Sequence, residues 1–203
     1  NMALEAGAKC GLFEADEKTA AYYGIPLSEI DWIRIDDEAQ YEKVLTYDVS
    51  TLEPQLSCPQ GVDNVYPISE VLGTPMDEVY IGSCTNGSLE DLKAAADILR
   101  GKKVANHVRV IVVPATNTVF KEAIEKGYIK DFIEAGCVIS HPCCGLCCGM
   151  PYGLMYDDER ILLTANRNFI GRQGTKKTLG YLSSPAVAAA TALTGVVTDP
   201  RTL

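Results

Sequence analysis

The chain has 203 residues, enough for one large or two small domains, and hydrophobic residues make up 47% of it, enough for a packed core. With 27 acidic and 18 basic residues its net charge is −9, which argues against nucleic acid as a partner. We find neither the roughly 18 consecutive apolar residues that a membrane helix needs nor a basic-then-apolar leader, and therefore expect a cytoplasmic protein without a membrane segment.

The first part of the chain, residues 1–48, alternates short helical patterns with turns. Residues 16–23 predict a helix that ends at Gly24, and residues 41–47 predict a strand with a polar face. Four prolines and two glycines over residues 49–76 are typical of a linker. We therefore expect a domain boundary in that stretch.

Beyond residue 76, strand and helix patterns alternate regularly. Apolar runs predict strands, and amphipathic runs with capping residues predict helices; the strands are expected over 79–82, 108–113, 137–139 and 161–164, and the helices over 88–99, 116–126, 129–134 and 185–193. This alternation predicts an α/β domain over residues 77–203, with a mostly parallel sheet in a three-layer α/β/α arrangement.

Eight cysteines are the unusual feature of the composition. Four lie within residues 143–148, where neighbouring cysteines are poorly placed to bridge each other, and the other four stand singly, as Cys10, Cys58, Cys84 and Cys137. This distribution does not fit a disulfide framework. It favours a metal or iron–sulfur site in a reducing compartment, with some cysteines left as ordinary core or surface residues.

Three polar segments each follow a predicted strand: residues 83–87, the cysteine loop at 143–148, and residues 165–169. In an open parallel sheet, ligands bind outside the carboxyl ends of the strands. We therefore expect the three segments to converge on one crevice.

Cysteines from two of these segments form a candidate metal site. Cys84 lies in a Gly-Ser-Cys-Thr-Asn-Gly turn, and Cys144 and Cys147 form a Cys-x-x-Cys pair, which alone is ambiguous among zinc, redox and iron–sulfur roles. Together they offer three thiolates. A purely electron-transferring cluster normally takes four cysteines, so three leave one iron with an exchangeable position that can act as a Lewis acid. Cys143 and Cys148 are alternative ligands.

Two arginines, Arg167 and Arg172, lie five positions apart in the glycine-bearing segment after the last predicted strand. Guanidinium groups are suited to planar, bidentate capture of carboxylates. The alternative is a pair of solvated surface arginines. Their place at a strand end, opposite the cysteines, favours the carboxylate site.

These segments together resemble the aconitase superfamily. Ile-Gly-Ser-Cys-Thr-Asn-Gly at 81–87, Cys-Gly-Leu-Cys at 144–147 and Asn-Arg-Asn-Phe-Ile-Gly-Arg at 166–172 occur in the order and approximate spacing of that family. Residues 1–8 look like a further family segment, and residues 198–201 look like the end of the large subunit in its 3-isopropylmalate dehydratase branch. The resemblance runs over nearly the whole chain.

The resemblance implies a set of site residues. It implies a 4Fe–4S cluster on three cysteines, and substrate carboxylates held by two arginines beside an asparagine; these residues are Cys84, Cys144, Cys147, Arg167, Arg172 and Asn166. It also implies that Asn1 lies near the cluster and binds substrate. Glu5 would orient a catalytic histidine that lies upstream of this chain.

Two departures from the family pattern stand out. The family usually has Gly-Cys-Gly-Pro-Cys-Leu-Gly where this chain has Cys143, Leu146 and Cys148 in place of the first glycine, the proline and the leucine. Gln173 stands where methionine is commoner in the 3-isopropylmalate dehydratase branch. The extra thiols could form disulfides if the cluster is lost, and the second departure leaves the exact substrate open.

The activity that the resemblance implies is that of a hydro-lyase of leucine biosynthesis, which interconverts hydroxy-acid isomers through an unsaturated intermediate. The substrate would be a hydroxy-dicarboxylate or tricarboxylate. Alternatives are the large subunit of homoaconitase or of a methylmalate or dimethylmalate dehydratase, and a non-catalytic iron–sulfur or zinc redox module.

The resemblance also implies partners and a domain layout. Residues 1–48 would end the second domain of the family, and residues 77–203 would form the third. A small subunit would carry the swivelling domain with the catalytic serine. The chain would be the carboxyl-terminal half of a large subunit, inactive without its upstream part.

Overall fold

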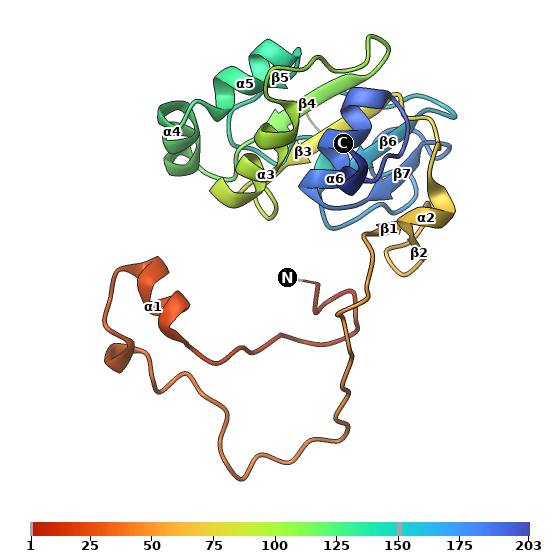
Figure 1. Cartoon of the computed structure of the whole chain (residues 1–203). Coiled ribbons are helices and arrows are strands. Elements are labelled where there is room, and N and C mark those ends of the chain that lie inside the picture. Colours follow the sequence, from red (N-terminus) through yellow and green to blue (C-terminus); the bar gives the residue numbers. More distant parts are fainter. Residues whose placement is uncertain (1, 150–151) are drawn as a thin grey trace. The chain divides into compact units, whose positions relative to one another are not determined.

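A computed structural model describes residues 2–149 and 152–203 of the chain (Figure 1). The chain divides into two compact units, Asn1–Leu52 and Glu53–Leu203, which are described separately below. Within the described ranges, no helix is both long enough and apolar enough to cross a membrane.

The first unit contains little regular structure. Helix α1, Glu17–Tyr23, begins where the Asp16 carboxylate accepts a hydrogen bond from the Thr19 N–H at 2.8 Å, and it ends at Gly24 in the left-handed conformation. A single 3-10 turn, η1, spans Leu27–Glu29. The predicted helix is confirmed, but the predicted strand over 41–47 is wrong. That segment is exposed throughout and pairs with no strand in the part of this unit that is described.

The second unit is built on one seven-stranded sheet of order β2-β1-β7-β6-β3-β4-β5. The strands are β1 Gln55–Ser57, β2 Val65–Pro67, β3 Glu78–Gly82, β4 Arg109–Val113, β5 Val138–Ile139, β6 Arg160–Leu163 and β7 Leu179–Leu182. The five strands from β7 to β5 in this order run parallel, and β1 runs antiparallel to both β2 and β7. The predicted α/β class with a mostly parallel sheet is confirmed.

The stretch predicted as a linker, residues 49–76, contributes to this sheet. It contains β1, β2 and the short helix α2, Ile68–Val71. The boundary between the two units falls between Leu52 and Glu53. Proline is tolerated in edge strands, where an N–H can be dispensed with, and Pro67 ends the edge strand β2. The prolines of residues 49–76 are therefore as compatible with short edge strands as with a linker.

The longer helices follow the strands as the sequence predicts. They are α3 Leu89–Leu99, α4 Asn117–Glu125, α5 Tyr128–Ala135 and α6 Pro185–Thr194, and two further 3-10 turns are η2 Gly145–Cys148 and η3 Pro200–Thr202. Ser88, Thr116 and Ser184 cap α3, α4 and α6, each accepting a hydrogen bond from a backbone N–H three residues on. These caps make the helix starts readable from the sequence.

The two faces of the sheet are covered by different layers. Val79 and Ile81 of β3 belong to a core that includes buried residues of α3, α5 and α6. Tyr80, pointing to the opposite face, packs with Leu146 of η2 and with Met155. The sheet thus lies between a helical layer, visible around β3 and β4 in Figure 1, and a second layer that contains η2, consistent with the predicted three-layer arrangement.

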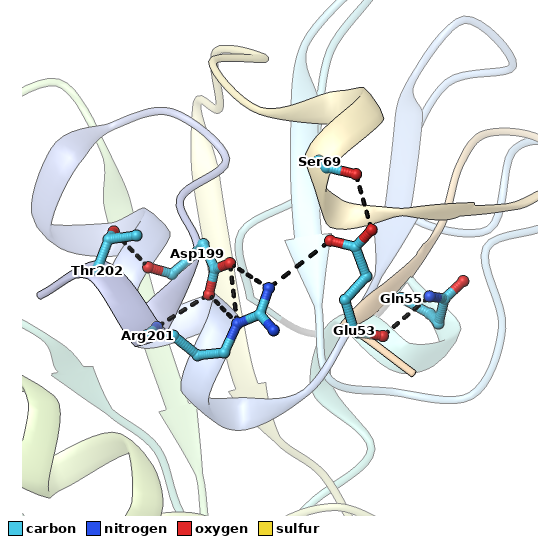
Figure 2. A network of polar contacts seen from close by, with 6 residues as sticks. All are labelled: Glu53, Gln55, Ser69, Asp199, Arg201 and Thr202. Atoms are coloured by element: carbon cyan, nitrogen blue, oxygen red, sulfur yellow. Dashed lines mark hydrogen bonds and ion pairs between the residues drawn. The ribbon is translucent and has the colours of Figure 1, made fainter. Parts of the chain in front are cut away.

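Polar contacts fix the carboxyl-terminal turn to the first strand (Figure 2). The Arg201 guanidinium donates to both oxygens of Asp199, which lowers the pKa of that carboxyl, and it lies 3.7 Å from Glu53 Oε2. The hydroxyl of Ser69 donates to Glu53 Oε1 at 2.8 Å. The network joins η3 to the start of β1 and to α2.

Candidate functional site

The three polar segments singled out in the sequence all follow parallel strands of one sheet. Residues 83–87 follow β3, the cysteine loop follows β5, and residues 165–169 follow β6. Because β6, β3, β4 and β5 are consecutive neighbours and run in the same direction, their carboxyl ends lie along one edge of the sheet. The predicted cysteines, Asn166 and Arg167 lie in these three segments at this edge.

The turn that carries Cys84 is packed tightly against the end of β4. Ser83 is buried and has a φ of 90°, a conformation that few non-glycine residues adopt. A Cβ at Gly87 would lie 2.6 Å from the carbonyl oxygen of Val113, so glycine is required for this close approach. The side chain of Cys84 itself is exposed. The turn is therefore a fixed backbone that presents one free thiol.

Hydrogen bonds tie this turn to the segment after β6. The Asn86 side-chain amide donates to the carbonyl oxygen of Thr164 and, at 3.2 Å, to Asn166 Oδ1. The Thr85 hydroxyl lies 3.4 Å from the same Asn166 oxygen. Asn166, a predicted substrate-binding residue, therefore lies beside the Cys84 turn, with its side-chain oxygen engaged in holding the two segments together.

The cysteine loop forms the short 3-10 turn η2. Cys144 precedes it, and the N–H of Cys147 donates to the Cys144 carbonyl oxygen at 3.0 Å. Leu146 is fully buried between them and anchors the turn on the sheet. Cys144 is exposed and Cys147 is half-buried, so both thiols remain at the surface of the loop.

Neighbouring thiols act electrostatically on Cys144. The pKa of the Cys144 thiol is raised mainly by the charge of Cys148. Cys84, burial and Cys147 raise it further, in this order of effect. Neighbouring negative charge disfavours the thiolate form, and a bound cation would relieve that repulsion. Cys84 and the Cys-x-x-Cys pair thus lie at the same edge of the sheet, and Cys84 is near enough to Cys144 for their charges to interact.

Burial raises the pKa of the Tyr80 hydroxyl, and the thiols of Cys143, Cys147, Cys144 and Cys84 add to the effect. The phenol therefore stays protonated, as a hydrogen-bond donor, throughout the physiological pH range.

Across residues 2–149 and 152–203, no three His, Cys, Asp or Glu side chains stand close enough together to hold a single metal ion. A single ion requires all its ligands around one centre. A 4Fe–4S cluster instead binds each thiolate at a different iron, so its ligands are spread more widely. Thiolates are also the ligands that iron–sulfur clusters prefer.

Arg172 lies against the cysteine loop. Its Nε donates to the Cys147 carbonyl oxygen, and its Nη2 lies 3.8 Å from Cys147 Sγ. Arg167 is half-buried, and its carbonyl oxygen accepts a hydrogen bond from the Gln173 side chain at 2.9 Å. Both predicted arginines thus belong to one loop, and this loop contacts the thiol site through Arg172.

Several residues that hold this loop were not singled out as site residues in the sequence. Asn168 is buried, and its amide donates to Ser57 Oγ and to the carbonyl oxygens of Cys58 and Gly180, at 2.9–3.1 Å. Gln173, noted above only as a departure from a family pattern, is equally buried. Polar residues in a loop sequence give no signal of burial, and their role depends on contacts with distant strands.

Two predicted site residues belong to the first unit. Asn1 lies outside the described residues. Glu5 lies in a turn of the first unit, where it is half-buried. Its predicted role, orienting a histidine from an upstream segment, stays a prediction.

Known proteins match this chain over the same segments that form the candidate site. The family model described as "Aconitase family (aconitate hydratase)" matches residues 1–78 and 70–195. A probable 3-isopropylmalate dehydratase large subunit of Methanosarcina mazei is 49% identical over 204 residues, covering 99% of this chain and 49% of that protein. The 3-isopropylmalate dehydratase large subunit of Nitratidesulfovibrio vulgaris is 48% identical, over 100% of this chain and 49% of that protein.

A large subunit of the same name from Archaeoglobus fulgidus is 49% identical, over 99% of this chain and 48% of that protein. The chain thus spans about half the length of the curated relatives it matches. The family model covers nearly all of the chain, and it includes the three segments that meet at the edge of the sheet. The chain therefore belongs to the aconitase family.

Proposed function

We propose that this chain is the cluster- and carboxylate-binding part of a hydro-lyase large subunit, of the 3-isopropylmalate dehydratase type used in leucine biosynthesis. The observation that carries the proposal is that Cys84 and the Cys144 and Cys147 pair follow parallel strands at one edge of the sheet, with Arg172 in contact with Cys147. Relatives named 3-isopropylmalate dehydratase large subunit support the choice of reaction.

The three thiols fit a 4Fe–4S cluster. Cys84, Cys144 and Cys147 come from two loops at one edge of the sheet and are exposed or half-buried, so their thiols are accessible to a cluster. When bound with three protein thiolates, such a cluster supplies an open iron that acts as a Lewis acid on a hydroxyl oxygen. Cys143 and Cys148 are not among the three ligands in this proposal.

Arg167 and Arg172 hold the carboxylates of the substrate. Arg172 already contacts Cys147, so a carboxylate bound to it places the rest of the molecule beside the thiol site. The planar guanidinium group fixes the orientation of a carboxylate by two parallel hydrogen bonds. This orientation aligns the departing hydroxyl and the neighbouring C–H bond, and fixing both in one geometry contributes to the rate.

The remaining groups of the reaction come from partners in this proposal. A small subunit with a swivelling domain supplies the serine that removes the proton, and an upstream part of the large subunit supplies a histidine that Glu5 orients. Asn1 contributes to substrate binding. Residues 1–48 then end a second domain, residues 77–203 belong to a third, and the protein is cytoplasmic. The chain alone is inactive.

A second candidate function is a redox or metal-binding module without turnover. It is favoured by the two extra cysteines, since Cys148 is the thiol that acts most strongly on Cys144. Against it stand Arg167 and Arg172, because a module that only senses oxidants does not need to bind carboxylates. A response of the bound cluster to a hydroxy acid separates the two functions.

Anaerobic reconstitution with iron and sulfide tests the proposal. We expect about four irons per chain in the wild type. We also expect a change in the electron paramagnetic resonance spectrum of the reduced sample when 3-isopropylmalate is added. Cys84→Ala should lose most of the iron, whereas Cys10→Ala, at an exposed cysteine of the other unit, should keep it. Binding of zinc in place of iron, or a cluster indifferent to Cys84 and to the acid, would favour the redox module.

A further inference from the structure

A tyrosine lies directly beneath the cysteine loop. Tyr80 is in the middle of β3, is fully buried, and is the largest side chain buried to this degree among the residues that the structure describes. Its hydroxyl donates a hydrogen bond of 3.0 Å to the carbonyl oxygen of Cys144, 64 positions along the chain. The central strand of the sheet is thereby joined to the backbone of a proposed ligand.

The loop is shaped to fit over this ring. Gly145 has a φ of 51°, and a Cβ added there would lie 3.1 Å from Cε2 and Cζ of Tyr80. Leu146 packs in the same buried cluster as Tyr80, and Cys143 and Cys147 lie against that cluster. The loop therefore lies on the tyrosine in one defined position.

The need for a large side chain in the core does not explain why this residue carries a hydroxyl group. A phenylalanine would occupy nearly the same volume, and a buried hydroxyl costs free energy unless it finds a hydrogen-bond partner. The partner here is the peptide of Cys144, whose carbonyl oxygen also accepts the N–H of Cys147. The hydroxyl thus acts on the turn that sets the relative positions of both cysteines.

The hydrogen bond from Tyr80 also links the cysteine loop to the strand that leads to Cys84. Cys84 follows two residues after the end of β3, and β3 is held on both sides by parallel pairing with β4 and β6. Tyr80 is on the same strand, so it fixes the cysteine loop to the element that carries the third thiol. A loop anchored elsewhere on the sheet would not be held in register with Cys84.

We propose that Tyr80 is a positioning residue of the thiol site, whose hydroxyl holds the Cys144 peptide so that Cys144 and Cys147 stand within reach of the same ligand as Cys84. The proposal rests on the proposed function in one respect, namely that this ligand is a 4Fe–4S cluster. The positioning of the thiols can be measured without the cluster.

Tyr80→Phe removes the hydroxyl and keeps the ring. Tyr128→Phe is a matched control, because Tyr128 is a buried tyrosine of α5 in the core on the helical face of the sheet. Both variants should have the far-ultraviolet circular dichroism spectrum of the wild type. After anaerobic reconstitution, Tyr80→Phe should release iron to a chelator about tenfold faster than the wild type, with an altered electron paramagnetic resonance spectrum. Tyr128→Phe should behave as the wild type in both assays.

A second arm uses the cluster-free chain. Diamide takes two electrons and two protons from a pair of neighbouring thiols, which join as a disulfide, and mass spectrometry of the peptides gives the yield of links between Cys84 and the loop 143–148. We expect a lower yield in Tyr80→Phe than in the wild type and in Tyr128→Phe. An equal yield in all three, or equal iron release, overturns the positioning role. A wild type that binds no iron overturns the proposed function alone, because the disulfide yield still decides on Tyr80.

Discussion

Glu78 is a buried carboxyl at the start of the central strand β3. Its side chain is fully buried at the start of β3, with Oε2 bonded to Arg109 Nε and with Oε1 lacking a hydrogen-bond partner in the part of the chain that the structure describes. Burial raises its pKa to about 7, the nearby Arg109 opposes this, and Glu159 adds to it. A carboxyl with such a pKa makes the stability of the fold depend on pH.

The sign of this dependence follows from proton binding. Between pH 4.5 and about 7 the native state keeps a proton on Glu78 that the unfolded chain has lost, so stability falls as the pH rises through this window. Relative to Glu78→Gln, the wild type should lose up to about 3 kcal/mol of unfolding free energy between pH 4.5 and 7. Urea unfolding of both proteins across that range measures the difference. A difference that does not change with pH would show that the carboxyl does not titrate there.

Single substitutions can show which of the four cysteines in the loop 143–148 are cluster ligands. We expect Cys144→Ser and Cys147→Ser to lose most of the reconstituted iron, since hydroxyls replace thiolates poorly on an iron–sulfur cluster. Cys143→Ser and Cys148→Ser should retain it. Iron analysis of the four variants after anaerobic reconstitution is the measurement. If Cys148→Ser lost as much iron as Cys144→Ser, Cys148 would be a ligand.

At the level of elements, the parallel core of the fold is predictable from local patterns. Strand β4 is a short apolar run, and α3 begins with Ser88 and Asp91, whose side chains both bond to the helix start. Strand β7 was not predicted. It has only four residues with alternating burial, and it becomes a strand because it pairs with β6, the preceding strand, and with β1, more than 100 residues upstream.

The parts of the candidate site that could be predicted are reactive side chains located just after predicted strands. Cys84, the Cys-x-x-Cys pair and the arginines have side chains whose chemistry suggests a role. Tyr80 and Asn86 do not, because a tyrosine in an apolar run resembles any core aromatic and an asparagine in a turn resembles any turn residue. Their roles come from partners 64 and 78 positions away, which no local pattern contains.

At the level of the whole molecule, the two units differ in how much they bury. Of residues 2–52, only Ala20 is buried, whereas the second unit has buried residues on both faces of its sheet. Segments with little buried apolar surface open at low free-energy cost. Limited trypsin digestion of the full chain should therefore cut first within the first 52 residues, at Lys9, Lys18, Arg34 and Lys43, and leave a resistant product that begins at Val44. Equal resistance of both units, seen by mass spectrometry of the products, would contradict this expectation.

The order of the strands also governs when the site can form. Strand β6 enters the sheet between β3 and β7, and the N–H of Gly82, next to the Cys84 turn, bonds to the hydroxyl of Thr164, 82 positions later. During synthesis, Cys84 leaves the ribosome long before this partner exists. The thiols and arginines can come together only when most of the second unit has been made. Whatever the site binds can therefore reach a formed site only after the segment that carries Thr164 and the two arginines has been made.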